Sequence, residues 1–150
     1  MLTLTRTDSS NRDFLCLVQL LDKEVQGRYG EEHAAIAPFN KLDDIKHVIV
    51  AYINGELAGC GAIKKYDGET AEIKRMFVHP RFRGSGVAKA VLEALEAWAI
   101  ELGYTFSILE TGIKQPEAIG LYSGLGYKQI PNFGQYAEIK ISLCFKKELK

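Results

Sequence analysis

Apolar and polar residues alternate with a period of two at the start of the chain, and a helical period soon replaces this pattern. Residues 2–7 alternate in this way and predict a strand. Ser10 is then a candidate N-cap, and apolar residues recur at a spacing near 3.6 until two glycines, Gly27 and Gly30. This apolar stripe consists of Phe14, Leu17, Val18, Leu21 and Val25. We therefore expect a strand followed by an amphipathic helix that ends at the two glycines.

The next regular pattern is a hairpin. The runs HVIVAYI and ELAGCGAI flank Asn54-Gly55, a pair that supplies the two positive φ angles of a type I′ turn. A second turn at Asp67-Gly68 leads into TAEIKRMFV, which reads as another strand. Residues 31–44, which precede the hairpin, are less regular, and we expect a short helix there and a loop around Pro38.

Helices and strands alternate in the second half of the chain. A short basic, glycine-rich loop follows Pro80, and residues 87–102 then show helical spacing. YTFSILET reads as a strand, and Pro116 opens a helix that ends before Gly126. YKQI and EIKISLCF supply two last strands, joined by the loop PNFGQYA. This order predicts an α/β fold with a mixed sheet, hairpins first and crossover helices later.

Length and composition indicate one globular domain over residues 1–150. Hydrophobic residues make up 47% of the chain and charged residues 25%. Nineteen basic and nineteen acidic residues cancel, so the chain lacks the charge expected of a protein that binds nucleic acid or an acidic membrane. The N-terminus has no signal-peptide pattern, and no apolar run is long enough to span a bilayer. We expect a cytoplasmic protein without a nucleic-acid or membrane partner.

The cysteines and histidines do not predict a metal site. Cys16, Cys60 and Cys144 form no CxxC pair, and their odd number and wide spacing predict buried, reduced thiols. The three histidines have no metal-ligand spacing to one another or to a cysteine.

The glycine-rich loop RGSG, residues 83–86, is the best candidate for a ligand site. The helix after it has Ser85 as its only polar cap candidate, so several of its first amide groups need other partners. A P-loop would require GxxxxGK followed by Ser or Thr, and a dinucleotide fingerprint would require a third glycine where Lys89 stands. Both of these ligand classes are therefore excluded.

A third pattern, R/Q-x-x-G-x-G/A, matches Arg83, Gly86 and Ala88. Small residues at these positions let amide groups approach a pyrophosphate at the positive end of the helix dipole. Arg81, Arg83 and Lys89 would add cationic partners for phosphate oxygens. Taken alone, the pattern leaves open a basic surface loop that enters a helix capped by Ser85.

Two segments around this loop resemble a known family. EIKRMFVHPRFRGSGVAKAVLEALEAWA resembles motif A of the GNAT superfamily, the acyl-CoA-dependent N-acyltransferases. QPEAIGLYSGLGY, at residues 115–127, resembles the second signature of that family. The resemblance implies the GNAT fold, a mixed and mostly antiparallel sheet of about seven strands flanked by about four helices. It also implies acetyl-CoA as the cofactor.

The resemblance implies which residues would bind the cofactor. The pyrophosphate would lie on the glycine-rich loop, and the pantetheine arm would pair with the backbone of the preceding strand, as an added strand does. The residues so implied are Met76, Phe77, Val78, Arg83, Gly84, Ser85, Gly86, Val87, Ala88, Lys89 and Gln115.

The catalytic pair implied by the resemblance is Glu72 as general base and Tyr122 as general acid. In an unbulged strand, a period of two would place Glu72 on one face with Lys74, Met76 and Val78. The alternatives are an exposed Glu72 paired with a lysine and a Tyr122 that only packs in its helix.

The walls of the acceptor site are predicted in three places. Arg28 and Tyr29 stand at the end of the first helix, where the resemblance implies one wall of the acceptor cleft, and an arginine there could hold a substrate carboxylate. Asn132 and Tyr136 lie in the loop PNFGQY, which could form the opposite wall. Arg75 on the cofactor strand is a candidate carboxylate partner or a member of an ion pair.

These residues predict an N-acetyltransferase that transfers acetyl directly from acetyl-CoA to a primary amine of a small molecule or peptide. All three cysteines lie outside the motifs, which disfavours an acyl-enzyme and favours a ternary complex. The alternative function is a non-catalytic CoA sensor with this fold. The resemblance also allows a homodimer through EIKISLCF, residues 138–145.

Overall fold

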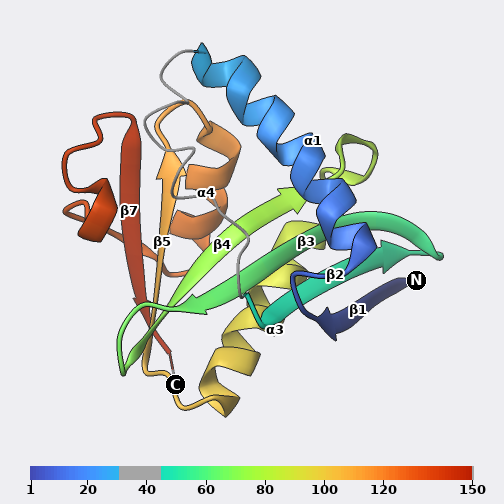
Figure 1. Ribbon diagram of the computed structural model, residues 1–150, viewed down its shortest axis with the longest axis horizontal. Helices are drawn as coiled ribbons and strands as arrows, with labels where there is room; N and C mark the ends of the chain where they lie inside the picture. The colour runs from blue at the N-terminus through green and yellow to red at the C-terminus, as the bar shows by residue number, and fades with distance from the viewer. Residues whose placement is uncertain (31–44, 150) are drawn as a thin grey trace.

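The computed structural model describes residues 1–30 and 45–149. The described strands form a single seven-stranded sheet in the order β1-β2-β3-β4-β5-β7-β6 (Figure 1). All neighbouring strands are antiparallel except β4 and β5, which are parallel. The strands are β1 (Leu2–Thr7), β2 (His47–Ile53), β3 (Glu56–Lys65), β4 (Thr70–Val78), β5 (Phe106–Gly112), β6 (Lys128–Ile130) and β7 (Ser142–Glu148). The expected mixed, mostly antiparallel α/β sheet is confirmed.

Three α-helices occur among the described residues, and the short helix expected within residues 31–44 lies outside them. These helices are α1 (Arg12–Tyr29), α3 (Val87–Glu101) and α4 (Pro116–Gly124), with short 3-10 turns η3 (Pro80–Phe82) and η4 (Gly134–Tyr136). No helix in these ranges is long and apolar enough to cross a membrane. The predicted cytoplasmic location stays a prediction.

The start of α1 differs from the sequence-based expectation. The N-cap is Asn11, whose side chain accepts a hydrogen bond from the Phe14 amide at 2.9 Å. Ser10 instead donates its hydroxyl to Asp8, so it is not the cap. The helix continues through Gly27 and ends at Gly30, which has a φ of 56°.

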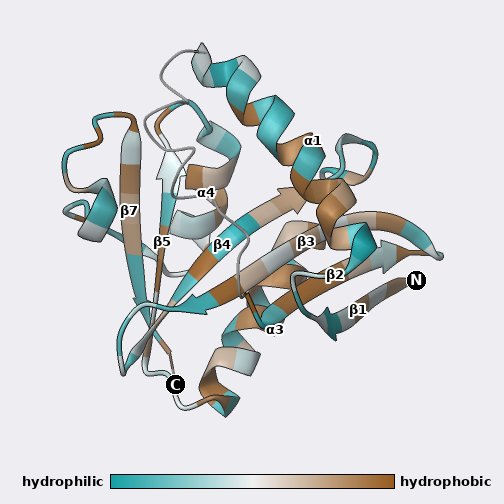
Figure 2. Cartoon of the chain, viewed as in Figure 1, coloured by the Kyte–Doolittle hydropathy of each residue, from teal (hydrophilic) through white to brown (hydrophobic). Residues whose placement is uncertain are grey.

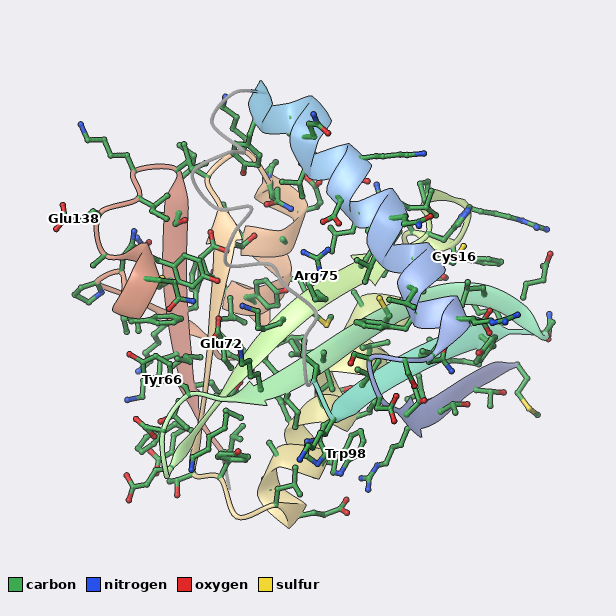
Figure 3. All side chains as sticks on the ribbon, viewed as in Figure 1. Cys16, Tyr66, Glu72, Arg75, Trp98 and Glu138 are labelled. Carbon is green, nitrogen blue, oxygen red and sulfur yellow. The ribbon has the colours of Figure 1, made fainter. Side chains whose placement is uncertain are left out.

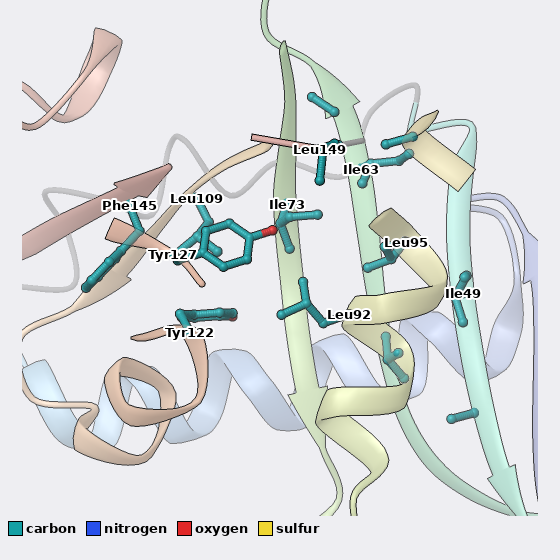
Figure 4. Packing of buried hydrophobic residues seen from close by; sticks show 14 of the residues in the cluster. Ile49, Ile63, Ile73, Leu92, Leu95, Leu109, Tyr122, Tyr127, Phe145 and Leu149 are labelled. Carbon is teal, nitrogen blue, oxygen red and sulfur yellow. The ribbon is translucent and has the colours of Figure 1, made fainter. Parts of the chain in front are cut away.

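The helices cover opposite faces of the sheet, and each face has its own core (Figure 1). The α1 stripe packs on one face with residues such as Val48, Val50 and Phe77. On the other face α3 and α4 enclose Ile73, Leu109 and the Tyr122 ring (Figure 4). Hydrophobic residues are concentrated along the central strands that these helices cover (Figure 2).

The predicted hairpin is confirmed. Asn54 and Gly55 have φ angles of 51° and 82°, and they join β2 to β3. On the far side of the sheet, β7 lies between β5 and β6, so the edge strand there is β6. A dimer through residues 138–145 stays a prediction, and within this range Cys144 and Phe145 already have a neighbouring strand on each side.

A bulge in β4 changes which face its last residues occupy. The register between β3 and β4 shifts between Cys60 and Ala62, and Arg75 has a φ of 58°. Ile73 and Met76 consequently pack in the same core, although three positions separate them. The expectation of an unbulged strand, with Glu72, Lys74, Met76 and Val78 on one face, is therefore wrong. The extra residue opposite Gly61 reverses the alternation.

Beyond the bulge β4 separates from β5. The parallel pairing runs only from Thr70↔Phe106 to Ile73↔Leu109, whereas β4 continues to Val78 and β5 to Gly112. Within the described chain no strand pairs with this side of β4 after Ile73, so backbone groups there can pair with an extended ligand, apart from the Val78 carbonyl, which accepts from Arg83 Nε.

Candidate active site

Two cavities meet where β4 and β5 separate. The larger, about 330 Å³, lies against the glycine-rich loop and the first turn of α3, and we call it the loop cavity. The smaller, about 100 Å³, contains the side chains of Glu72 and Glu110, and we call it the carboxyl cavity. Both cavities are lined by Leu21, Met76, Gln115, Ala118 and Tyr122. Residues at this junction could therefore contact ligands bound in either cavity.

The start of α3 is open toward the loop cavity. Its N-cap is Gly86, with a φ of 84° and no capping side chain, and Gly84 has a φ of 83°. At neither glycine would an added Cβ meet another atom within 4 Å. Ser85 donates its hydroxyl to the Phe82 carbonyl instead, so the alternative of a helix capped by Ser85 is wrong. The first amides of α3 and its dipole can therefore receive an anion.

The loop cavity is lined by ten of the eleven residues implied for the cofactor. These are Met76, Phe77, Val78, Arg83, Gly84, Gly86, Val87, Ala88, Lys89 and Gln115. Ser85 is the exception, because its side chain bonds back to the loop.

Several charged residues that line the loop cavity form ion pairs. Arg83 lies 2.6 Å from the Glu24 carboxylate and donates through Nε to the Val78 carbonyl at 3.0 Å. Arg28 contacts Glu24 at 3.4 Å and also pairs with Glu117. Glu24 and Glu117 line the loop cavity, so an incoming anion would compete with Glu24 for Arg83.

The carboxyl cavity holds a buried ion pair on β4. Glu72 and Lys74 are 5% and 8% exposed, and their charged atoms lie 3.6 Å apart. Burial raises the pKa of Glu72 and lowers the pKa of Lys74, while each partner's charge opposes the shift in the other. The predicted alternative of an exposed Glu72 is therefore wrong, since its side chain is buried and lines the carboxyl cavity.

Glu110 on β5 was not predicted from the sequence. Its side chain lines the carboxyl cavity, and its Oε2 atom is buried without a hydrogen bond in the described part of the chain. Burial raises the pKa of Glu110 to about 7. The only sequence signal was one carboxylate in the otherwise uncharged strand YTFSILET.

Tyr122 stands at the junction of the two cavities and is 6% exposed. Its ring packs against those of Tyr127 and Phe145, with centroids 5.8 and 6.5 Å away (Figure 4). Burial raises the pKa of its hydroxyl, and the charge of Glu110 adds to this effect. The phenol therefore keeps its proton at neutral pH and is available as a donor.

Of the predicted acceptor residues, the structure places Arg75 and Tyr136 in the carboxyl cavity. Arg75 is paired with Asp22 of α1 at 2.5 Å and lies between β4 and that helix (Figure 3). Asn132 donates to the backbone carbonyls of Tyr136 and Ser142, so it holds the loop that carries Tyr136.

Arg28 and Tyr29 line neither cavity. Arg28 donates to the Lys114 carbonyl at 2.8 Å, and the Tyr29 hydroxyl accepts from the Lys114 amide at 2.9 Å. The Tyr29 hydroxyl also lies 3.4 Å from Gln115 Oε1, which accepts from the Gly112 amide. Both residues thus fasten α1 to the segment that begins α4, and their contact with an acceptor stays a prediction.

The cysteines lie outside both cavities. Cys60 and Cys144 are buried as expected, but Cys16 is exposed because it lies on the solvent side of α1 (Figure 3). Within residues 1–30 and 45–149, no three His, Cys, Asp or Glu side chains form a group suited to a metal ion.

Comparisons with known proteins agree with this geometry. The model of the Acetyltransferase (GNAT) family matches residues 14–127. An IAA acetyltransferase from Azospirillum brasilense is 33% identical over 98% of this chain and 97% of its own. A Klebsiella pneumoniae structure assigned as an acyl-CoA N-acyltransferase is 31% identical, with a TM-score of 0.80 over 100% of this chain and 99% of that one. A GNAT acetyltransferase from Elizabethkingia anophelis, solved with acetyl-CoA bound, shares the fold at 20% identity, with a TM-score of 0.70 over 99% and 98% of the two chains.

Proposed function

The chain belongs to the acetyltransferase (GNAT) family and is an acyl-CoA-dependent N-acetyltransferase, and we propose that it acetylates a primary amine of a small molecule or peptide in a ternary complex. The observation that carries this proposal is the meeting of two cavities at Tyr122 and Met76. One cavity has the donors for an anionic cofactor, and the other has the carboxyls for an amine. Direct transfer is also supported by the position of all three cysteines outside the cavities.

The residues of the loop cavity fit acetyl-CoA, the cofactor of this family. The open amides after Gly86 and the side chains of Arg83 and Lys89 would hold its pyrophosphate. The unpaired side of β4 from Met76 to Val78 would receive the amides of its pantetheine arm. We propose the Met76 amide as the donor that polarises the thioester carbonyl.

When bound, acetyl-CoA supplies an acetyl group activated as a thioester, and its transfer to a neutral amine yields the amide and the CoA thiol. An acceptor that binds as an ammonium ion loses one further proton to solvent. An alkylamine with a pKa of ~10.4 is unprotonated in only about one molecule in 10³ near neutral pH. We propose that Glu72 accepts the amine's proton, and that Lys74 favours the ionised form of Glu72 before the reaction. Tyr122 would donate its proton to the leaving sulfur.

An assay for the release of CoA thiol with a panel of primary amines tests the proposed reaction. We expect at least one amine to raise thiol release well above the rate without acceptor. If CoA binds but no amine raises the rate, the chain would instead act as a CoA sensor, and the proposed acceptor chemistry would be wrong.

Replacing Glu24 by glutamine is expected to increase the affinity for CoA about fivefold, because Arg83 then loses its competing carboxylate. This factor corresponds to ~1 kcal/mol, the upper end for a partly exposed ion pair. Isothermal titration calorimetry with CoA measures it. Glu56→Gln is the matched control, since Glu56 pairs with Arg81 at 2.7 Å outside the loop cavity. Unchanged or weaker binding in Glu24→Gln would show that Glu24 does not compete with the cofactor.

Glu72→Gln is expected to lower kcat by about 10²-fold, the usual effect of losing a positioned base. Burial raises the pKa of Glu72, so the acid limb of the wild-type pH profile should lie above the range of an ordinary carboxyl and should disappear in the variant. Stopped assays across pH measure both effects. The exposed Glu69 provides the control variant Glu69→Gln, which should behave as wild type. A Glu72→Gln enzyme with normal kcat and an intact acid limb would remove Glu72 from the mechanism.

A further inference from the structure

We propose that Glu110 binds the amine as its ammonium cation, so that the acceptor is a compact cationic amine without a carboxylate near the reacting nitrogen. This inference rests on the proposed acetyl transfer. The inference assigns a specificity-determining residue and a class of acceptor to that reaction.

Among the charged groups at the carboxyl cavity, one carboxylate has no cationic partner in the described part of the chain. Lys74 is paired with Glu72 at 3.6 Å, and Arg75 is paired with Asp22 at 2.5 Å. Glu110 forms no ion pair among the described residues, although it lines the same cavity. When all five groups are ionised, the cluster therefore carries one uncompensated negative charge, and that charge is on Glu110.

The buried Oε2 atom of Glu110 is an acceptor in need of a donor. It makes no hydrogen bond of good geometry within the described chain, although the Ser142 hydroxyl lies close enough to lower the pKa of Glu110. A buried acceptor without a well-aligned partner carries a desolvation cost. An ammonium group has three N–H donors and a full positive charge, so it would supply both the hydrogen bond and the missing counter-charge.

The position of Glu110 relative to the two catalytic candidates suits an acceptor nitrogen. Glu110 lines the carboxyl cavity together with Glu72 and Tyr122. The charge of Glu110 raises the pKa of Tyr122, and the charge of Glu72 raises the pKa of Glu110. A cation held by Glu110 would therefore lie near the junction of the cavities and would also relieve the repulsion between the two carboxyls. The titratable groups that face Glu110 are Glu72, Lys74, Tyr122, Tyr136 and Cys144.

An acceptor with a carboxylate beside its amine fits this cavity poorly. Both described cations of the cavity, Lys74 and Arg75, already have carboxylate partners, and the volume is about 100 Å³. A substrate carboxylate would have to displace Glu72 or Asp22 and would face the charge of Glu110. Simple alkylamines avoid both costs.

Two nearly isosteric amines separate charge recognition from shape. Ethylamine is a cation at pH 7, whereas 2,2,2-trifluoroethylamine is largely neutral because fluorine withdraws electrons. In Glu110→Gln we expect KM for ethylamine to rise by about 10- to 100-fold, the effect of losing a charge-assisted hydrogen bond, and KM for the fluorinated amine to stay within about threefold. Equal KM values for ethylamine in wild type and variant would overturn the inference.

The control variant is Glu72→Gln, which removes the other carboxyl of the same cavity. It should lower kcat while changing KM for ethylamine much less than Glu110→Gln does. In wild type, n-propylamine should also be acetylated with a KM about tenfold or more below that of glycine, which is of similar size but carries a carboxylate on the carbon beside its amine. A preference for glycine would contradict the proposed substrate class.

Direct binding keeps this test separate from the proposed reaction. Calorimetry with ethylamine and the CoA-saturated enzyme should detect binding in wild type and about 10-fold or greater loss in Glu110→Gln. If wild type binds ethylamine without acetylating it, the proposed function fails and the role of Glu110 holds. If wild type acetylates ethylamine and Glu110→Gln binds it equally well, only the inference about Glu110 fails.

Thermal unfolding shows whether Glu110 is merely structural. The pKa of its carboxyl rises from 4.5 to about 7 in the folded protein, so ionising it destabilises the fold as pH increases through this window. Glu110→Gln should therefore have a Tm at pH 8 equal to or above that of wild type. A clearly lower Tm together with loss of both amines would assign Glu110 a structural role and overturn the inference.

Discussion

Replacing Tyr122 by phenylalanine is expected to lower kcat for acetyl transfer by about 10²-fold or more, with little change in the affinity for CoA. The substitution removes only the hydroxyl of a buried residue that lines both cavities. The ring and its contacts with Tyr127 and Phe145 remain. Thiol-release kinetics and calorimetry with CoA measure the two quantities.

Tyr127→Phe is the matched control for this variant. The Tyr127 hydroxyl is buried in a network in which it lies 2.8 Å from the Ser107 hydroxyl and donates to Glu96 at 2.9 Å. Its loss should lower Tm, because it leaves buried partners unsatisfied, and should change kcat little. A Tyr122→Phe enzyme with the wild-type rate would exclude Tyr122 as the proton donor.

The Gly86→Val variant should lose about 10²-fold or more of its affinity for CoA, so that calorimetry detects little heat. The position opens into the loop cavity, and a branched side chain there would block the approach of phosphate to the first amides of α3. Losing even one charge-assisted hydrogen bond to the pyrophosphate accounts for this factor. The positive φ of 84° adds strain at the start of the helix.

Gly103→Val is the control that distinguishes backbone strain at a positive φ from a side chain that blocks the cofactor. Gly103 follows the other end of α3, has a φ of 94° and also has no atom within 4 Å of an added Cβ. Both variants should therefore lose a similar amount of stability, ~1–2 kcal/mol in urea titrations. Only Gly86→Val should lose CoA binding. If both variants bound CoA normally, the pyrophosphate would have to lie elsewhere.

The sequence alone was sufficient for the features that depend on neighbouring residues. The Asn54-Gly55 turn, the α1 stripe and the alternation of later helices and strands were predicted because each rests on steric rules acting over a few residues. The glycine-rich loop could also be predicted from the sequence, because positive φ angles and the lack of a side chain are properties of Gly84 and Gly86 themselves. Tyr122 was found through its motif rather than through its surroundings.

The sequence alone does not decide which polar group caps a helix. Ser10 and Asn11 are both good caps, and the choice depends on where the chain leaves β1. Ser85 was the only polar cap candidate for α3, but the loop conformation directs its hydroxyl back to the Phe82 carbonyl. In both cases the preceding turn decided which group faces the helix.

Only the tertiary structure decided the charge arrangement of the site. The bulge at Arg75 depends on pairing with β3, so the sequence of β4 could not show that Met76 changes face. From the sequence, Arg28 and Arg75 were candidates to hold a substrate carboxylate, and only the fold shows that each has a carboxylate partner on another element. Glu110 became a candidate only when the fold buried it without a counter-charge. Conformational preferences are encoded locally, whereas burial and electrostatic pairing depend on which distant elements pack together.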